Sequence, residues 1–392
     1  MAKPVGPICN LNCTYCYYLE KEKLYPRGVD FRMSPEVLEA FIRDYISLQD
    51  SSEVSMVWQG GEPTLIGLDF FESVVALQKK YANGRIVRNA IQTNGTRLDD
   101  AWCRFFKANH FLVGVSIDGP PDLHDVYRLD KGGQPTLDSV MAGITLLKQY
   151  GVEFNTLTVV SATNVKHPLK IYEFLKDQGS GFLQFIPLVE RELSGVSEKF
   201  APPPESGESP REVTPWSVPP VAYGEFLCTI FDHWVRHDVG NVFVQIFDVA
   251  LGIWSGQGSS LCVFQENCGR ALALEHNGDL YSCDHYVYPK FHLGNLLNKS
   301  LGAMVESPRQ QEFGQAKSAT LPKYCLQCEV RFACNGECPK HRFAKTPDGE
   351  EGLNHLCEAY KKFFTHIDKP MRAMSALLRS GRPPADIMRY KL

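Results

Sequence analysis

The sequence predicts an α/β protein: a partial (β/α)6 barrel followed by a cysteine-rich C-terminal domain. Two observations predict this fold class. Short β-rich runs alternate with helical patterns over residues 34–187, and the density of cysteines rises from Cys262 onward. Because alternating βα units form parallel sheets, we expect the active site at the carboxyl ends of the strands, where the loops gather.

The elements of the barrel follow from the spacing of apolar residues. Strands are expected at residues 54–58, 86–93, 111–117, 153–160 and 182–186, with a short first strand near residues 3–8. Helices are expected at residues 35–48, 70–81, 101–109, 137–150, 168–178 and, beyond the barrel, 223–237. Ser34 before Pro35 is typical of a helix N-cap with proline at the first helical position.

A proline-rich segment separates the two predicted parts of the chain. Residues 201–220 contain seven prolines and only Trp216 as a large apolar group, which is typical of an extended surface connection. The predicted domains are a barrel at 1–200, a linker or insertion at 201–222, a helical connection at 223–261, a cysteine-rich domain at 262–365 and a C-terminal helical segment at 366–392.

Composition excludes several function classes. The 392 residues include 41 Lys and Arg against 45 Asp and Glu, a net charge of -4, so neither nucleic acid nor an anionic membrane is an expected partner. Residues 1–12 lack an apolar core, and no stretch approaches the roughly 18 apolar residues of a membrane span. We therefore expect a cytoplasmic protein. Its 13 cysteines, an odd number, favour metal or redox chemistry.

Three cysteines follow the first expected strand with the spacing C-x3-C-x2-C. Cys9, Cys13 and Cys16 can hold three corners of a [4Fe-4S] cluster, which normally takes four cysteines, so one iron would stay open for a small molecule. A zinc site completed by a distant residue such as His110, or three buried thiols, are the alternatives.

The motif WQGGEP at residues 58–63 follows the second expected strand. A Gly-Gly turn there allows backbone groups to approach a ligand closely. Together with C-x3-C-x-aromatic-C, in which Tyr15 is the aromatic residue, this motif resembles the radical S-adenosylmethionine (SAM) superfamily over nearly all of residues 1–190. The resemblance implies that SAM binds the open iron and yields a 5′-deoxyadenosyl radical after one-electron reduction.

The same resemblance implies the residues that contact SAM. They are Gly60, Gly61 and Glu62 for the methionine part, Tyr15 for the adenine side, and Ser116 in VSIDG with Arg128 in VYRLD for the ribose and carboxylate. Val189, just after the last expected strand of the barrel, is a weaker candidate for lining the adenine. Without the resemblance, Ser116 and Arg128 would be a strand-end hydroxyl and a solvated arginine.

Eight further cysteines lie within residues 262–357. The run C-x2-C-x5-C-x3-C from Cys325 to Cys338 indicates metal binding, although spacing alone does not distinguish zinc from iron. The order of all eight resembles the SPASM extension of radical SAM enzymes that modify peptides. This resemblance implies two auxiliary [4Fe-4S] clusters, one on Cys262, Cys268, Cys283 and Cys338 and one on Cys325, Cys328, Cys334 and Cys357, and therefore three clusters in all.

Two cysteines remain outside these sets. Cys103 and Cys228 lie in helical patterns and are expected to be small buried hydrophobes.

Asp284 directly follows Cys283 and is the candidate catalytic residue. Its carboxylate could act as a general base or could orient the cluster loop as a hydrogen-bond acceptor. The segments MAKPVGPICNLNC, IQTNGT, SIDGP and NGDLYSCDHYVYP resemble the anaerobic sulfatase-maturating enzymes, which favours the base. That resemblance implies oxidation of a cysteine or serine of a sulfatase polypeptide to Cα-formylglycine, an electron that leaves through an auxiliary cluster, and flavodoxin or ferredoxin as the electron donor.

Two other classes of function remain open. A different peptide maturase would form a thioether or carbon–carbon crosslink, and would often need a winged-helix domain, for which we see no segment before Cys9. A non-enzymatic zinc-binding interaction module would leave GGEP and C-x3-C-x2-C unexplained.

Overall fold

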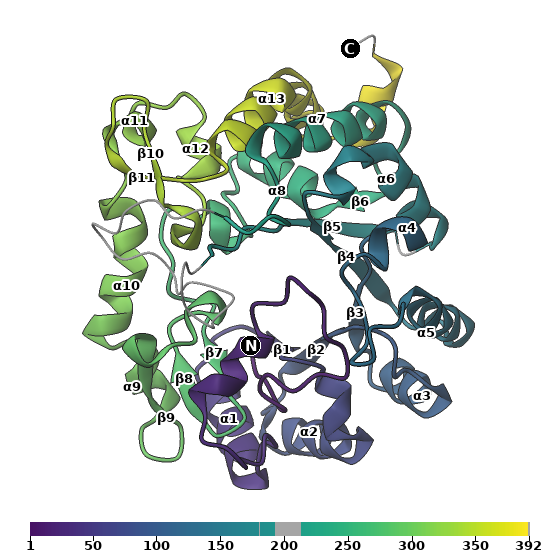
Figure 1. Ribbon diagram of the computed structural model, residues 1–392, viewed down its shortest axis with the longest axis vertical. Coiled ribbons are helices and arrows are strands. Elements are labelled where there is room, and N and C mark those ends of the chain that lie inside the picture. Colours follow the sequence, from purple (N-terminus) through teal and green to yellow (C-terminus); the bar gives the residue numbers. More distant parts are fainter. Residues whose placement is uncertain (180, 193–212, 391–392) are drawn as a thin grey trace. The chain divides into compact units, whose positions relative to one another are not determined.

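The computed structural model describes residues 1–179, 181–192 and 213–390 (Figure 1). The chain divides into two compact units. The first comprises residues 1–117, 124–155 and 269–314, and the second comprises the described residues of 118–123, 156–268 and 315–392. Each unit therefore combines segments of the predicted barrel with segments of the predicted cysteine-rich domain.

The first unit contains three parallel strands in chain order: β1 (Glu53–Trp58), β2 (Ile86–Thr93) and β3 (Leu112–Ser116). Buried and exposed residues alternate along β1, as expected for a strand with one buried face. The helices that connect and flank these strands are α1 (Pro35–Ser47), α2 (Leu68–Tyr81), α3 (Asp100–Ala108) and α5 (Leu137–Tyr150) (Figure 1). The Ser34 hydroxyl accepts a hydrogen bond from the Val37 N–H at 3.3 Å, so the predicted cap of α1 is confirmed.

An antiparallel sheet completes the first unit. It consists of β7 (Ala273–Leu274), β8 (Asp279–Tyr281) and β9 (His292–Asn295), followed by α9 (Leu301–Val305). Ala2 forms parallel bridges to both Trp58 of β1 and Leu274 of β7. The N-terminal residues are thus fixed between the two sheets.

The strand predicted near residues 3–8 is absent from the described structure. Residues 4–7 form a turn, and pairing in this region is limited to the single residue Ala2. Pro4 and Pro7 lack the N–H groups that a strand interior needs, and Gly6 has a positive φ of 52°. These residues therefore form a loop that presents the first cysteines.

The second unit contains the parallel strands β4 (Phe154–Val160), which pairs from Thr156 onward, β5 (Phe182–Pro187) and β6 (Phe243–Val244). The sixth parallel strand is thus β6, in the middle of the predicted helical connection. The helices of this unit are α4 (Pro121–His124), α6 (Pro168–Asp177), α7 (Pro220–His237), α8 (Gln245–Trp254), α11 (Lys323–Leu326), α12 (Arg331–Cys334) and α13 (Cys357–Arg379). A short hairpin of β10 (Ala344–Lys345) and β11 (Glu351–Leu353) lies between α12 and α13 in the chain. Helix α10 (Pro308–Ala319) contains one boundary between the units, after Gly314, and α4 and β4 contain two others, after Leu123 and Asn155.

Helices α7 and α13 pack closely in the second unit. A Cβ atom on Gly224 would lie 3.0 Å from the Cα atom of Ala359, so glycine is needed for this approach. Aromatic rings fill the same interface, including Tyr223 and Tyr360 at 6.0 Å between ring centroids. Since α13 begins at Cys357 and ends at Arg379, one continuous helix crosses the predicted boundary at residue 366.

The end of the proline-rich segment is packed. Residues 201–212 lie outside the described residues. Thr214, Ser217 and Val218 are buried, and Val218 donates its N–H to the Leu188 carbonyl at 2.8 Å. This end of the segment is therefore part of the second unit rather than a surface connection.

The predicted fold class, a parallel-strand α/β core with a cysteine-rich C-terminal domain, is confirmed. Over the described residues, none of the helices is long and apolar enough to cross a membrane. Cys103 and Cys228 are buried, as expected from their helical patterns.

Candidate functional site

The first three cysteines lie on the loop that follows the turn at residues 4–7. The Cys9 sulfur accepts hydrogen bonds from the Leu11 N–H at 3.3 Å and the Asn94 amide at 3.7 Å. The Cys16 N–H donates to the Cys13 carbonyl at 3.1 Å, which closes a turn. Burial raises the pKa of Cys9 to about 11. A thiol with a raised pKa becomes a thiolate readily only with positive charge beside it, as a metal centre supplies.

Two glycines bring the loop after β1 against the loop that carries the cysteines. The Gly61 N–H donates to the Gly6 carbonyl at 2.8 Å, and the Glu62 N–H donates to the Ile8 carbonyl at 2.9 Å. A Cβ atom on Gly61 would lie 2.1 Å from the Ile8 carbonyl oxygen. The close approach that the Gly-Gly turn permits is therefore one between two segments of this chain.

We expect Gly61→Ala to lower the free energy of unfolding by about 3 kcal/mol, because the added methyl group meets fixed backbone rather than a flexible side chain. Gly252→Ala in α8 is a matched control, since its nearest neighbour would lie 3.7 Å away. Chemical denaturation of both variants checks this. Equal stability of Gly61→Ala and the unsubstituted protein would contradict the packing described here.

The carboxylate of Glu62 is fully buried and links the loops after β1 and β2. Its Oε1 accepts hydrogen bonds from the Thr64 hydroxyl at 2.6 Å, the Thr64 N–H at 3.1 Å and the Thr93 hydroxyl at 2.8 Å, and its Oε2 accepts from the Asn94 N–H at 2.7 Å. Burial raises the pKa of Glu62, and these hydrogen bonds oppose that effect. Glu62 thus positions Asn94, which in turn contacts Cys9.

Tyr15 and Arg128 lie together in the first unit. The Arg128 guanidinium is 5.6 Å from the centroid of the Tyr15 ring. The ring of Tyr127 contacts the Tyr15 ring edge-on, with 5.9 Å between the ring centroids. Ser116 ends β3 and is buried in the same unit. Val189 is buried in the second unit, two residues after β5.

Asp284 is paired with a lysine and a tyrosine. Its Oδ1 accepts a hydrogen bond from the Lys3 ammonium, and its Oδ2 accepts one from the Tyr17 hydroxyl at 3.0 Å. The Asp284 side chain is 14% exposed and that of Lys3 is 2% exposed. Burial alone would raise the pKa of Asp284, but Lys3, His285 and Tyr17 together lower it to about 2. Asp284 is therefore a carboxylate at neutral pH.

The bridges of Ala2 explain this pairing. The Lys3 N–H donates to the Leu274 carbonyl of β7 at 2.9 Å, which places Lys3 beside the antiparallel sheet. Asp284 follows β8 of that sheet, and Tyr17 follows Cys16. One hydrogen bond thus separates Asp284 from the residue next to a candidate cluster ligand.

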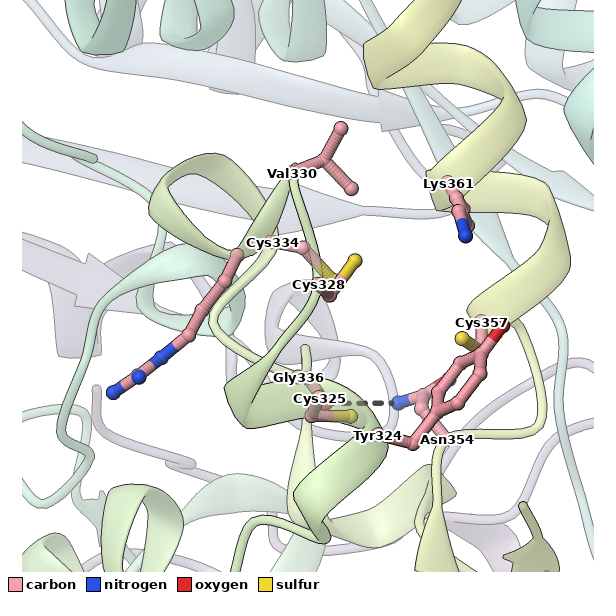
Figure 2. A pocket seen from close by; sticks show the side chains of 10 residues that line it. Tyr324, Cys325, Cys328, Val330, Cys334, Gly336, Asn354, Cys357 and Lys361 are labelled. Carbon is pink, nitrogen blue, oxygen red and sulfur yellow. Dashed lines mark hydrogen bonds between the residues drawn. The ribbon is translucent and has the colours of Figure 1, made fainter. Parts of the chain in front are cut away.

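Four cysteines of the second unit line one hollow of about 380 Å³, a volume that includes space open to solvent. They are Cys325, Cys328, Cys334 and Cys357. Figure 2 shows Cys325 and Cys357 facing each other across this hollow, with Cys328 and Cys334 beside them. Burial raises the pKa of Cys357 to about 11 and that of Cys334 further. Four thiols converging on one hollow fit a group that takes four thiolate ligands.

The other predicted set of four spans both units. Cys283 belongs to the first unit, and Cys262, Cys268 and Cys338 belong to the second. Among the described residues, no three His, Cys, Asp or Glu side chains are grouped so as to hold a single metal ion. His110 precedes β3, at the amino end of the strand, whereas Cys9 contacts Asn94 after the carboxyl end of β2. His110 therefore lies at the wrong end of the sheet to complete the first set.

Comparisons with known proteins agree with this arrangement. The family model of the radical SAM superfamily matches residues 4–175, and that of the SPASM iron-sulfur cluster-binding domain matches residues 262–329. Fold, cysteine loops and family models thus define a radical SAM enzyme with a SPASM domain.

Longer matches specify the family. The chain is 47% identical to a serine-type anaerobic sulfatase-maturating enzyme of Bacteroides thetaiotaomicron, over 99% of this chain and 94% of the relative. It is 34% identical to a cysteine-type anaerobic sulfatase-maturating enzyme of Clostridium novyi, over 93% of each. The solved structure of native anSMEcpe with bound AdoMet and Kp18Cys peptide matches with a TM-score of 0.83 at 33% identity, over 96% of this chain and 98% of that one. The chain belongs to the anaerobic sulfatase-maturating enzymes.

Sequence reasoning missed the residues that surround the predicted ones. Sequence patterns do not indicate that Lys3 and Tyr17 contact Asp284. Nor do they indicate that Asn94 contacts Cys9 and Glu62. Lys3 and Asn94 lie in the segments MAKPVGPICNLNC and IQTNGT, which carry the family resemblance, and Tyr17 directly follows the motif residue Cys16.

Proposed function

We propose that this chain oxidises the side chain of a cysteine or serine in a sulfatase polypeptide to Cα-formylglycine. The printed names of the relatives and the peptide in the solved structure support this substrate class. The observation that carries the proposal is Asp284: a carboxylate held ionised by Lys3 and Tyr17, one residue from Cys283 and one hydrogen bond from the neighbour of Cys16.

The cysteines account for three [4Fe-4S] clusters in this proposal, one on each of the three sets. The converging thiols around the hollow and the half-buried thiols of the first loop fit thiolate ligands. With SAM bound, a cluster held by Cys9, Cys13 and Cys16 would supply the radical chemistry that removes a hydrogen atom from the substrate carbon. The auxiliary clusters are the proposed route for the electron that leaves afterwards.

The residues around the first cysteine loop are proposed to hold SAM. Arg128 and Tyr15 together present a cation and a flat ring, which suit a carboxylate and an adenine. Ser116 and Val189 are assigned the ribose and the adenine. Gly60, Gly61 and Glu62 are assigned the methionine part, and Glu62 also fixes Asn94 beside Cys9.

Asp284 is proposed to accept the substrate proton. A pKa of about 2 makes it a weak base, which a neutral thiol or hydroxyl would not readily protonate. Once a hydrogen atom and an electron have left the carbon, however, the group that remains is a protonated thiocarbonyl or carbonyl, which is a strong acid. The depressed pKa therefore suits a proton that departs with or after the electron.

Both target residues give a balanced reaction. Serine loses a hydrogen atom, an electron and a proton, and the aldehyde forms directly. Cysteine gives a thioaldehyde by the same three losses, and water then replaces sulfur with release of hydrogen sulfide. A flavodoxin or ferredoxin is the proposed electron donor, and a cytoplasmic location suits 13 cysteines that cannot all be paired.

Incubation of the reconstituted protein with SAM, a reductant and sulfatase-type peptides that contain cysteine or serine tests the proposal. Mass spectrometry should show formylglycine, and iron analysis should give about twelve irons per chain for three cubanes. A crosslinked peptide would indicate the other class of maturase. Zinc in place of iron would exclude the reaction.

A further inference from the structure

Two buried cations lie among the cysteines of the second unit. The Lys317 side chain is fully buried, and its ammonium donates hydrogen bonds of 2.8 Å to the carbonyls of Cys262 and Val263. Arg342 is also buried, and its guanidinium donates to four backbone carbonyls, those of Gly336, Lys317, Asn335 and Glu337. In the part of the chain that the structure describes, no carboxylate forms an ion pair with either cation.

Backbone carbonyls satisfy the hydrogen bonds of these cations but do not neutralise their charge. A buried charge without a counter-charge costs several kcal/mol, so an anion is expected nearby. Glu337 is a buried carboxylate whose backbone contacts Arg342, and it could act as a counter-charge. Its carboxylate already accepts hydrogen bonds from His341 at 2.9 Å and Asn354 at 2.6 Å. One carboxylate offsets one of the two cations at most.

Cysteines supply the remaining negative charge only when they are ionised. A thiol is ordinarily neutral near pH 7, and it becomes an anion when it binds a metal centre.

The cations lie differently with respect to the two auxiliary sets. Lys317 contacts the backbone of Cys262, a member of the first set. The Arg342 guanidinium donates to the carbonyls of Asn335, which follows Cys334 of the second set, and of Glu337, which precedes Cys338 of the first. Arg342 therefore lies next to members of both sets, whereas Lys317 lies next to a member of the first set.

We propose that Lys317 and Arg342 raise the reduction potentials of the auxiliary clusters, and so make them acceptors for the electron that leaves the substrate. A cubane on four thiolates is an anion, and reduction adds one further negative charge. A fixed cation in a poorly screened interior stabilises the reduced state more than the oxidised state. This inference rests on the proposed function for the direction of electron flow, but not for the potentials themselves.

Redox titration monitored by electron paramagnetic resonance tests the proposal. The full-length chain carries Cys9→Ala, Cys13→Ala and Cys16→Ala, so that only the auxiliary clusters contribute to the signal. With Lys317→Met added, we expect the ratio of reduced to oxidised cluster at a fixed ambient potential to fall at least tenfold, which corresponds to about 59 mV. Arg342→Gln, which keeps hydrogen-bond donors but removes the charge, should lower the potentials of both clusters.

Two controls accompany these variants. Lys317→Arg retains the charge and should titrate close to the parent. Lys369→Met removes an exposed charge from α13, twelve residues beyond Cys357, and should leave both potentials unchanged. Unchanged potentials in both Lys317→Met and Arg342→Gln, at full iron content, would overturn the proposal.

The titration contains no substrate, so its outcome is independent of the proposed reaction. Shifted potentials without formylglycine formation by the unsubstituted enzyme would reject the reaction and leave the electrostatic role in place. Formylglycine formation by the unsubstituted enzyme, with unshifted potentials in the variants, would support the reaction and reject the electrostatic role.

Discussion

Replacement of Cys9, Cys13 or Cys16 by alanine is expected to reduce the release of 5′-deoxyadenosine from SAM to background. Each substitution removes one of the three cysteines that this loop carries, and with it one proposed ligand of the cluster. Iron content should fall by about four per chain, the loss of one cubane. Chromatographic detection of 5′-deoxyadenosine under reducing, oxygen-free conditions measures the effect.

Cys103→Ala provides the matched control. Cys103 is a fully buried cysteine of the same unit, in α3, and belongs to none of the three sets. Its substitution removes packing volume but no proposed ligand, so iron content and SAM cleavage should persist. Cleavage at the normal rate in Cys9→Ala, Cys13→Ala or Cys16→Ala would show that the loop does not hold the cluster.

Asp284→Asn should retain the clusters and SAM cleavage but lose formylglycine formation by about 10²- to 10⁴-fold, the usual contribution of a general base. The amide can still accept a hydrogen bond from Lys3 or Tyr17, but it cannot take up the substrate proton. Because the pKa of Asp284 is lowered to about 2, the carboxylate is ionised throughout the pH range of an assay. Its protonation should therefore not limit activity in mild acid.

The substitution Asp284→Asn should also destabilise the protein, because it leaves the buried ammonium of Lys3 without its charged partner. Breaking such a pair costs about 3–5 kcal/mol. The double variant Lys3→Met with Asp284→Asn removes both charges and should recover much of that stability without recovering product. Quantification of 5′-deoxyadenosine and formylglycine in the same samples separates the two effects, and full product yield from Asp284→Asn would reject the base.

The lowered pKa of Asp284 also makes the free energy of unfolding depend on pH. The folded value of about 2 lies below the ordinary value of 3.8. The stabilisation from ionised Asp284 is therefore complete above the ordinary value and is lost as the pH falls through about 2.

Regular elements of the barrel could be predicted closely from the sequence. The expected helix at residues 137–150 and the expected strand at residues 86–93 have those bounds in the structure. Both have long, uniform patterns of apolar residues, which local physics determines. Strand β6 could not be predicted, because its two residues Phe243 and Val244 are too few to form a pattern.

Contacts between distant segments account for what the sequence did not reveal. Lys3 and Asp284 are 281 residues apart, and their pairing depends on the bridge from Ala2 to β7. The apolar content of residues 4–7 predicts a strand, whereas the missing N–H groups of Pro4 and Pro7 favour the turn that the structure has. The resemblance to the SPASM extension implies the two sets of four cysteines, but it does not indicate the buried cations Lys317 and Arg342.

The interleaving of the two compact units limits how this enzyme can be engineered. A fragment that ends before residue 262 would lack β7, β8 and β9, and with them the partners of Ala2 and Lys3. Its first unit would expose the surfaces that these strands cover. The cysteine-rich portion therefore does not form a unit that can be separated from the rest of the chain. Chimaeras made by exchanging it between relatives should fold only when the N-terminal residues are exchanged with it.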